Sequence, residues 1–280
     1  MRLGYELGYV KNITKPSDLR NPDNCPTKIL TDEERLYIRI FGLPDTVKQQ
    51  QAREVFSIMD TMPFTSVLDV GCAQGHYSVR IARRYPNSRV KGTDRNKEKL
   101  DTAILVKKTF GLKNLNFEQT DVCTSNAKDK YDLVLLLQVI EHLENDRMAL
   151  GRIRQVIDGK GHLIITAPNI HSSIVEWNKR HLTVAGHWRD GYSDNELARK
   201  VTEANFKIEE IRHISGTIGQ LVEKLETYFK LNLPLLFPLC YPFFHLLSFF
   251  DDVFTARGER NTSGILIVAV AKEAAPAREY

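Results

Sequence analysis

Cysteine is scarce in this chain of 280 residues. The four cysteines, Cys25, Cys72, Cys123 and Cys240, lie far apart, and no two of them form a CxxC pair. Disulfide-stabilised small domains and zinc knuckles both need denser or closely paired cysteines. The sequence therefore argues against a disulfide framework and a zinc knuckle, and it fits a protein of a reducing compartment.

A strong charge of one sign is also missing. The chain has 39 Lys and Arg against 35 Asp and Glu, which gives a net charge of +4. No long run of Lys and Arg forms the basic stripe that is typical of nucleic-acid-binding proteins. The first residues, MRLGYELGYVKN, lack the apolar core of a signal peptide, so we expect a cytoplasmic protein.

From Val67 onward, short apolar segments alternate with helical patterns. The segment Leu133–Leu137 is apolar throughout, which is typical of a strand that is covered on both faces. The alternation predicts an α/β fold, with a doubly wound, mostly parallel sheet and helices on both faces. We expect strands at residues 67–70, 89–93, 114–119, 132–137, 162–166, 206–213 and 264–270, and helices at residues 75–84, 97–110, 146–157 and 194–204.

Three regions lie outside this alternation. Residues 1–61 are turn-rich and then helical, with helices expected after Thr31 and from Asp45 to Asp60, and we assign them to an N-terminal helical cap. Residues 62–280 form the α/β domain. Within it, Asn169–Tyr192 is expected to be a loop, and an apolar helical insertion at about residues 215–260 precedes the last strand.

The insertion contains the segment Leu231–Phe250, twenty residues without Asp, Glu, Lys or Arg. Its length approaches that of a membrane span, but three prolines recur every four residues from Pro234 to Pro242 and remove backbone donors. Two other interpretations are a helical lid on the sheet and an interfacial hairpin that dips into a membrane. Flanking basic residues favour the membrane contact, whereas Asp251 and Asp252 oppose it.

A glycine loop follows the first expected strand, in the sequence Val67-Leu68-Asp69-Val70-Gly71-Cys72-Ala73-Gln74-Gly75. A strand, a tight glycine turn and a helix together make a cofactor cradle. A dinucleotide site would favour G-x-G-x-x-G, but Ala73 holds the middle position and Ser78 the last. The loop therefore argues against NAD without excluding it.

The same loop resembles motif I of the class I S-adenosylmethionine-dependent methyltransferases, with Ala73 in place of the middle glycine. The resemblance covers residues 62–214 and implies a Rossmann-like sheet of seven strands with an antiparallel last strand, and S-adenosyl-L-methionine as the cofactor. Further motifs of the family follow in order, at residues 90–94 (second strand with its terminal acid), 119–122 (acidic turn), 131–143 (fourth strand with its Glu-His continuation) and 159–169 (fifth strand with its Pro-Asn end).

The resemblance also implies a set of cofactor-binding residues. Asp94 would accept both ribose hydroxyls, Asp121 would accept the adenine amino group, and Val122 would donate its backbone N–H to the ring. Gly71 and Gly75 would allow a close backbone approach to the methionine moiety, and Asp69 would position its ammonium group through the loop or a water. Gln138 would face the same moiety, and the cofactor-binding set is completed by Cys72 in the loop and by Arg95 next to Asp94. Three alternatives stay open: Asp94 as a helix N-cap, Asp121 in an Asx turn, and Gln138 in a strand-end hydrogen bond.

Two histidines are candidate general bases for methyl transfer to a hydroxyl group. His142 follows the fourth strand, and His187 lies in a segment that resembles one bordering the acceptor pocket in this family. The alternatives are that His142 packs beneath the site and that His187 lies in a surface loop. A metal site made of His171, His181 and His187 matches no ligand spacing, so we expect no metal.

The expected function is O-methylation of a glycan, lipid-linked or other small hydroxylated acceptor. The alternatives are C- or N-methylation of a quinone precursor or other metabolite, an NAD-dependent oxidoreductase, and a non-catalytic scaffold that binds S-adenosylmethionine. Nucleic-acid methylation is disfavoured because no Asn-Pro-Pro-Tyr type motif follows the fourth strand. The expected partners are a small-molecule or lipid-linked acceptor, with peripheral membrane contact through residues 231–250.

Overall fold

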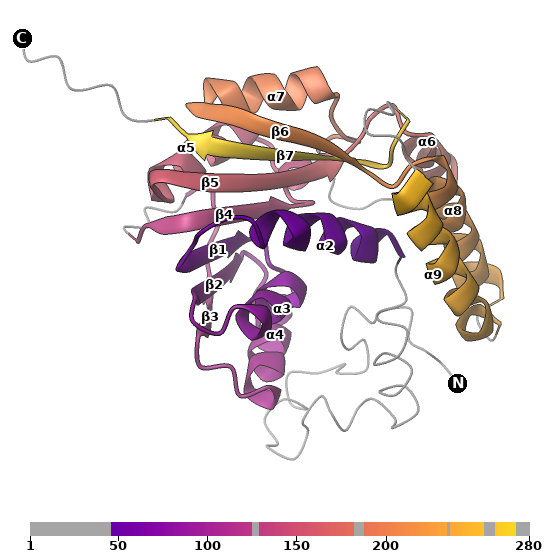
Figure 1. Ribbon diagram of the computed structural model, residues 1–280, viewed down its shortest axis with the longest axis horizontal. Coiled ribbons are helices and arrows are strands. Elements are labelled where there is room, and N and C mark those ends of the chain that lie inside the picture. Colours follow the sequence, from indigo (N-terminus) through magenta and orange to yellow (C-terminus); the bar gives the residue numbers. More distant parts are fainter. Residues whose placement is uncertain (1–45, 125–128, 182–187, 234–235, 255–260, 273–280) are drawn as a thin grey trace, which may run out of the picture.

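A seven-stranded sheet lies at the centre of the computed structural model, which describes residues 46–124, 129–181, 188–233, 236–254 and 261–272. The strands are β1 (Ser66–Val70), β2 (Arg89–Asp94), β3 (Leu115–Gln119), β4 (Tyr131–Leu137), β5 (Ile157–Pro168), β6 (Phe206–Ile214) and β7 (Gly264–Ala271). Their order is β3-β2-β1-β4-β5-β7-β6, and β7 runs antiparallel to both of its neighbours (Figure 1). The predicted fold class is confirmed.

Helices cover both faces of the sheet, because the side chains of each strand alternate between the two faces. The core on one face is formed with α2 (Thr46–Met59), α3 (His76–Arg84) and α4 (Lys97–Thr109), and the core on the other with α5 (Asp146–Val156) and α7 (Asp194–Glu203). In β4, Leu133 and Leu135 belong to the first core, whereas Val134 and Leu136 belong to the second. This double burial explains the continuous apolar sequence of β4.

A helix interrupts the segment Asn169–Tyr192, so the prediction of a loop there is wrong in part. The helix is α6 (Ser173–His181). Ser172 Oγ accepts the Val175 N–H at 3.2 Å, and Gln220 Oε1 accepts the Ile174 N–H at 3.3 Å. Because Gln220 is distant in the sequence, the start of α6 depends on a tertiary contact that local pattern does not reveal.

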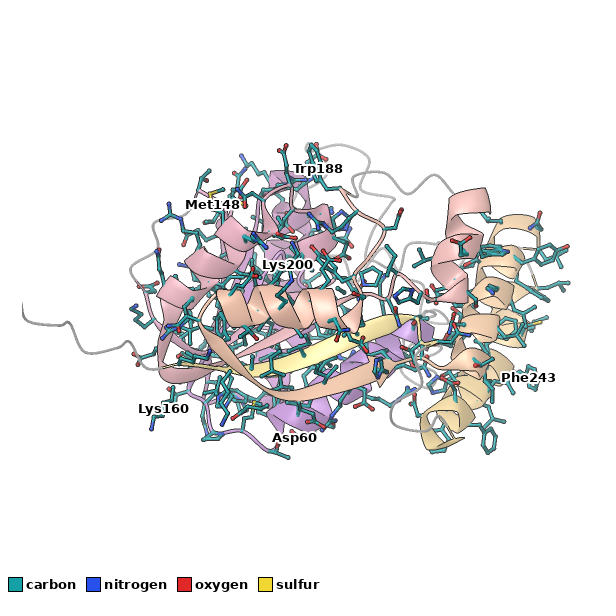
Figure 2. All side chains as sticks on the ribbon, turned by 90° about the horizontal axis from the view of Figure 1, so that it is seen from above. Asp60, Met148, Lys160, Trp188, Lys200 and Phe243 are labelled. Atoms are coloured by element: carbon teal, nitrogen blue, oxygen red, sulfur yellow. The ribbon has the colours of Figure 1, made fainter. Side chains whose placement is uncertain are left out.

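The apolar insertion forms a helical hairpin at one side of the molecule (Figures 1 and 2). Its helices are α8 (Thr217–Asn232) and α9 (Phe237–Phe254), which share a small core that includes Val222 and Tyr241. Pro242 lies inside α9, where it lacks the N–H that a helix interior would use. In the part of the chain that the structure describes, none of the helices combines the length and the hydropathy that a membrane span requires.

The described part of the predicted N-terminal cap is α2. Its Ala52, Val55 and Phe56 are buried in the core of the sheet face that also carries α3 and α4. The helix expected after Thr31 lies outside the described residues. The boundary near residue 62 and the capping role of residues 1–61 therefore stay predictions.

Candidate active site

A cavity lies at the carboxyl ends of β1, β2 and β4, where the strand order reverses between β1 and β4. Ligands of open α/β sheets bind at such switch points. The volume of the cavity is about 200 Å³. It is lined by Val70, Gly71, Ala73, Asp94, Arg95, Lys99, Thr120, Asp121, Val122, Gln138, Val139, His142 and Leu143. Most of the residues that the sequence predicted for cofactor binding are therefore gathered around one space.

The loop between β1 and α3 depends on its two glycines. Gly71 and Gly75 have φ angles of +71° and +78°, a region that side chains of L-residues disfavour. A Cβ atom on Gly71 would lie 2.5 Å from Val139 Cγ2, and one on Gly75 would lie 2.7 Å from Phe117 Cζ. Gly71 thus lets the loop approach the chain after β4, and Gly75 lets α3 begin close to β3.

Two cavity residues that are not glycine, Ala73 and Gln138, also have left-handed backbones, with φ angles of +48° and +54°. Each such conformation carries strain of about 1–2 kcal/mol. Hydrogen bonds hold both backbones: the Ala73 N–H donates to Asp94 Oδ2 at 2.9 Å, and the Gln138 N–H donates to the Thr166 carbonyl at 3.1 Å. Ala73 therefore has a left-handed backbone, and glycine, the usual residue at this middle position of motif I, adopts that conformation more easily.

Replacing Ala73 with glycine is expected to stabilise the protein by about 0.5–1 kcal/mol. The change removes the backbone strain of a left-handed alanine, while the greater conformational freedom of glycine in the unfolded chain offsets part of the gain in stability. Chemical denaturation measures the difference. Ala198→Gly, within α7, is the control, because glycine in a helix interior destabilises by about 1 kcal/mol. An Ala73→Gly variant as unstable as this control would contradict the strain at Ala73.

Asp94, the last residue of β2, is held by two backbone groups. Its Oδ2 accepts the Ala73 N–H at 2.9 Å, and its Oδ1 accepts the Asn96 N–H at 2.8 Å. The cap of α4 is Asn96, whose side chain accepts the Lys99 N–H at 3.1 Å, so the alternative of Asp94 as the N-cap is wrong. A carboxylate has about four acceptor positions, so Asp94 keeps lone pairs for a ligand in the cavity.

Asp121 follows β3 and lies on the same cavity as Asp94. Its Oδ1 accepts the Cys123 N–H at 2.8 Å, which is the Asx turn that the sequence left open. The turn uses one acceptor position and leaves others on the carboxylate. The Asx turn and a ligand contact are therefore compatible, and the neighbouring Val122 lines the cavity as well.

Asp69, Cys72 and Gly75 were predicted to bind the cofactor, but they are not among the lining residues of the cavity. Asp69 is 3% exposed and accepts the Ser78 hydroxyl at 2.5 Å. Burial raises the pKa of Asp69 to about 6, although the Ser78 hydrogen bonds act in the opposite direction. The Cys72 thiol is buried too, and burial raises its pKa. The Asp69 and Cys72 side chains are therefore buried supports of the loop.

His142 lines the cavity from the short 3₁₀ turn η2 (Ile140–His142), which follows β4. The second candidate base, His187, lies outside the described residues. The neighbouring Glu141 is 1% exposed, and burial raises the pKa of its carboxyl to about 7. The Glu141 carbonyl accepts the Trp188 N–H at 3.0 Å, which ties the turn that carries His142 to the chain after residue 187.

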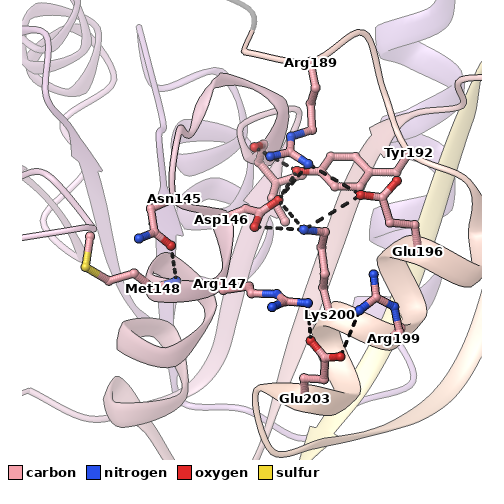
Figure 3. Close-up of polar contacts among 11 residues, drawn as sticks. Asn145, Asp146, Arg147, Met148, Arg189, Tyr192, Glu196, Arg199, Lys200 and Glu203 are labelled. Carbon is pink, nitrogen blue, oxygen red and sulfur yellow. Dashed lines mark hydrogen bonds and ion pairs between the residues drawn. The ribbon is translucent and has the colours of Figure 1, made fainter.

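A buried ion-pair cluster supports the same turn (Figure 3). Asp146, at the start of α5, lies 3.0 Å from Lys200 Nζ and 3.2 Å from Arg189 Nη1, and its side chain is 5% exposed. The Tyr192 hydroxyl donates to Asp146 Oδ2 at 2.8 Å and lies 3.2 Å from the Ile140 carbonyl oxygen. The cluster therefore joins α5, α7 and η2, and no sequence motif indicated it.

Several cavity residues were missed from the sequence, among them Lys99, Thr120, Val139 and Leu143. Lys99 lies in the first turn of α4, and Thr120 directly precedes Asp121. Val139 and Leu143 flank η2 and add apolar surface. Each lies within about six residues of the carboxyl end of a predicted strand, where ligands of such sheets bind. This position in the sequence could have identified them.

The spacing of His171, His181 and His187 in the sequence argued against a metal site made of these histidines. Within the described ranges, no group of three or more His, Cys, Asp and Glu is placed to hold a metal ion. His187 lies outside these ranges.

Comparison with known proteins identifies the family. A family model described as a methyltransferase domain matches residues 63–227, which is more than half of the chain. A probable (S)-tetrahydroprotoberberine N-methyltransferase of Papaver bracteatum is 30% identical over 88 residues, covering 31% of this chain and 25% of that protein. A ubiquinone biosynthesis O-methyltransferase of Rickettsia typhi is 25% identical over 177 residues, covering 59% of this chain and 70% of that protein.

The fold also resembles solved structures. Phosphoethanolamine N-methyltransferase 2 of Haemonchus contortus, in complex with S-adenosyl-L-methionine, has a TM-score of 0.60 at 16% identity, covering 85% of this chain and 56% of that one. At this identity the likeness supports the fold alone. The chain spans about a quarter of the length of several curated relatives that it matches.

The family model decides the assignment, because it covers most of the α/β domain. The chain belongs to the class I S-adenosylmethionine-dependent methyltransferases. The predicted family is confirmed, and with it S-adenosylmethionine as the cofactor of that family. The alternative of an NAD-dependent oxidoreductase is set aside.

Proposed function

We propose that this member of the family transfers a methyl group from S-adenosylmethionine to a hydroxyl oxygen of a glycan, lipid-linked or other small hydroxylated acceptor. One observation carries the proposal: the carboxylates of Asp94 and Asp121 and the imidazole-bearing His142 line the same cavity. The carboxylates suit a cofactor with hydroxyl and amino groups, and the histidine suits an acceptor that must lose a proton.

The residues of the cavity fit this cofactor. Asp94 would accept hydrogen bonds from the two ribose hydroxyls on the acceptor positions that its backbone contacts leave, and Asp121 would accept one from the adenine amino group. Gly71 lines the cavity without a side chain, so it would allow the methionine moiety to approach the backbone closely. Val122 and Leu143 add apolar surface beside these polar groups. Gln138 and Arg95 complete the polar lining.

His142 is the base in this proposal. When bound, S-adenosylmethionine supplies an electrophilic methyl group on a sulfonium with a good leaving group. The chain's own contribution is to align the acceptor oxygen, to exclude water with Val139 and Leu143, and to accept the hydroxyl proton on the His142 ring. The Asp146 cluster and the Glu141 carbonyl fix the turn that presents this ring.

N-methylation of a small metabolite is the second candidate, because several matched relatives are named as N-methyltransferases of plant alkaloids. A neutral amine attacks through its own lone pair and needs no base for bond formation. C-methylation of a quinone precursor and a non-catalytic scaffold remain further alternatives. In this proposal O-methylation needs His142 as a base, whereas N-methylation does not. A His142 variant therefore distinguishes the two reactions.

Replacing His142 with glutamine is expected to lower the turnover of a hydroxylated acceptor by roughly 10²–10⁴-fold, the usual contribution of a general base. Affinity for S-adenosylmethionine should change little, since His142 is proposed to serve the acceptor. The measurement is methyl transfer from labelled cofactor to a panel of phenols, methyl glycosides, polyprenyl-linked sugars and amines.

His171→Gln is the matched control, because His171 is exposed and is not part of the cavity lining. Undiminished transfer to a hydroxyl by His142→Gln would contradict a base role. Transfer to amines alone, equal in both variants, would replace the proposal with N-methylation.

A further inference from the structure

A carboxylate is buried without a cationic partner where the α8–α9 hairpin meets α2. Asp251, near the end of α9, is 1% exposed. Its Oδ2 atom accepts the Gly216 N–H and the Gln50 side-chain amide, both at 2.9 Å. No Lys or Arg among the residues that the structure describes forms an ion pair with Asp251. A buried charge is costly unless it is paired or coordinates a metal ion, and two neutral hydrogen bonds supply no opposite charge.

The neighbouring acid does not change this charge balance. Asp252 pairs with Arg53 of α2, with 2.7 Å between Asp252 Oδ2 and Arg53 Nε. The Arg53 cation is therefore matched to Asp252, and one negative charge is left at the junction. Both aspartates face α2, whereas Leu239 and Phe243 of the same helix are exposed.

Oxygen atoms crowd around the Gln50 side chain. Its amide nitrogen lies 2.9 Å from Asp251 Oδ2, 2.8 Å from Asp252 Oδ1 and 3.2 Å from the Ser248 carbonyl oxygen. An amide NH₂ group has two hydrogens, so it cannot give each of three acceptors a hydrogen bond of its own. The junction thus holds more acceptors than donors.

Two further oxygens at this place have no hydrogen-bond partner within the described part of the chain. They are Gln50 Oε1 and Ser215 Oγ, and the two residues are 1% and 5% exposed. Gly219 of α8 shows where they lie. A Cβ atom at this glycine would lie 2.2 Å from Ser215 Oγ, 2.6 Å from Asp251 Oδ2 and 3.1 Å from Gln50 Oε1. Oxygens from α2, α9 and the end of β6 therefore converge on one buried spot.

The chemistry of these atoms indicates the kind of ligand. They are oxygens of carboxylate, amide, hydroxyl and carbonyl groups, which hard cations prefer, whereas zinc and similar metals favour nitrogen and sulfur. The described ranges place no group of three or more His, Cys, Asp and Glu to hold a metal ion, which argues against a transition metal here. The single unmatched negative charge suits a cation with one positive charge.

We propose that Asp251, Gln50 and Ser215 bind an alkali-metal cation, sodium or potassium, at the junction of the hairpin with α2. The Asp252 and Ser248 oxygens lie within reach of the same spot. Because β7 is antiparallel to both β5 and β6, Ser215 at the end of β6 lies at the sheet edge where the cofactor cavity opens. The cation would fix the hairpin at this edge, and the proposal does not depend on the identity of the acceptor.

The test is thermal unfolding of the full chain in chlorides of sodium, potassium and N-methylglucamine at equal ionic strength. The wild-type protein is expected to unfold about 3 °C or more higher in the sodium or potassium salt than in the N-methylglucamine salt. Asp251→Asn keeps an acceptor for the Gly216 N–H and removes the charge, so it should lose this shift. Ser215→Ala removes one ligand and should reduce it.

Two variants serve as matched controls. Ser248→Ala removes a buried hydroxyl of α9 that donates to the His245 carbonyl, and it keeps the Ser248 carbonyl oxygen. Asp60→Asn removes an exposed acid that pairs with Arg84. Both should keep the shift of the wild-type protein. If Asp251→Asn does not fold, hydrogen exchange of the wild-type protein and Ser215→Ala decides: sodium or potassium should slow exchange in α8 and α9 of the wild-type protein and do so less in the variant.

Three results would overturn the proposal. Equal unfolding temperatures of the wild-type protein in all three salts would show that a buried water or no ligand occupies the spot. A full wild-type shift in both Asp251→Asn and Ser215→Ala would place the cation elsewhere. Loss of the shift in Ser248→Ala and Asp60→Asn as well would reduce it to a general effect of salt on the fold.

Discussion

Asp94→Ala is expected to bind S-adenosylmethionine roughly a hundredfold or more weakly than the wild-type protein. A hydrogen bond to a charged acceptor contributes about 1.5–3 kcal/mol, and two ribose hydroxyls would lose such a partner. Because 1.4 kcal/mol corresponds to a factor of about ten, the two bonds alone account for this loss. The Ala73 and Asn96 N–H groups also lose their acceptor, so the strained loop is held less firmly. Isothermal titration calorimetry measures the affinity.

Glu98→Gln is the control for Asp94→Ala. Glu98 is an exposed acid in the first turn of α4, only four residues from Asp94, and it is not part of the cavity lining. Its replacement removes a nearby negative charge without touching the proposed ribose contact. Unchanged affinity in Asp94→Ala, or an equal loss in Glu98→Gln, would show that Asp94 does not hold the cofactor.

Asp146→Ala is expected to destabilise the folded protein by about 3 kcal/mol. Removing one partner of a buried ion pair leaves uncompensated charge and costs about 3–5 kcal/mol. Lys200 is 8% exposed and would lose its closest carboxylate. Glu196 lies 3.8 Å from Lys200 and 3.5 Å from Arg189, so it compensates in part and favours the lower end of that range. Urea denaturation at neutral pH measures the change.

The pH dependence of this effect follows from the pKa of Asp146. Burial alone would raise that pKa, but hydrogen bonds from Tyr192 and Lys200 and the nearby charges hold it below its ordinary value. A carboxyl with a lowered pKa stabilises the fold above its unfolded pKa and loses that contribution as pH falls through the folded pKa. The difference in unfolding free energy between the wild-type protein and Asp146→Ala should therefore shrink below about pH 4.

A neighbouring exposed ion pair provides the control for Asp146 (Figure 3). Glu203 pairs with Arg147 and Arg199 at 3.0 Å, and all three side chains are more than 40% exposed. Glu203→Ala should change stability by less than about 1 kcal/mol. If Asp146→Ala were no more destabilising than Glu203→Ala, the buried cluster would not be the support of η2 that its contacts indicate.

Local pattern was enough to predict the sheet, and the family resemblance identified most of the predicted residues that line the cavity. The apolar run of β4 and the glycine turn after β1 identify strand ends, and the carboxyl ends of parallel strands meet at one edge. The family resemblance then assigned Asp94, Asp121 and Gln138, which lie at or just after the ends of three different strands, to one site. Their proposed roles toward the cofactor are still predictions.

The buried position of Asp69 follows from the alternation of side chains along β1. Side chains alternate along a strand, so Asp69 shares a face with Val67, and Val67 belongs to the core beneath α2 and α3. Asp69 accordingly meets Ser78 of α3 instead of the cavity. A role for Asp69 toward the ammonium group of the cofactor, through the loop or a water, stays a prediction.

Other features depend on contacts that no local pattern encodes. Asp251 meets Gln50, which is 201 residues away, and Asp146 meets Lys200, which is 54 residues away. The sequence therefore showed the acids beside the apolar segment but not that they point away from its exposed face. The start of α6 was missed for the same reason, since Gln220 helps to fix it.

The most direct measurement is the titration of S-adenosylmethionine and of NAD, separately, into the purified wild-type protein by calorimetry. The account predicts saturable binding of S-adenosylmethionine and no binding of NAD, because the carboxylates and the Ala73 loop of the cavity suit the first ligand. Binding of NAD with no binding of S-adenosylmethionine would contradict the assignment of this cavity.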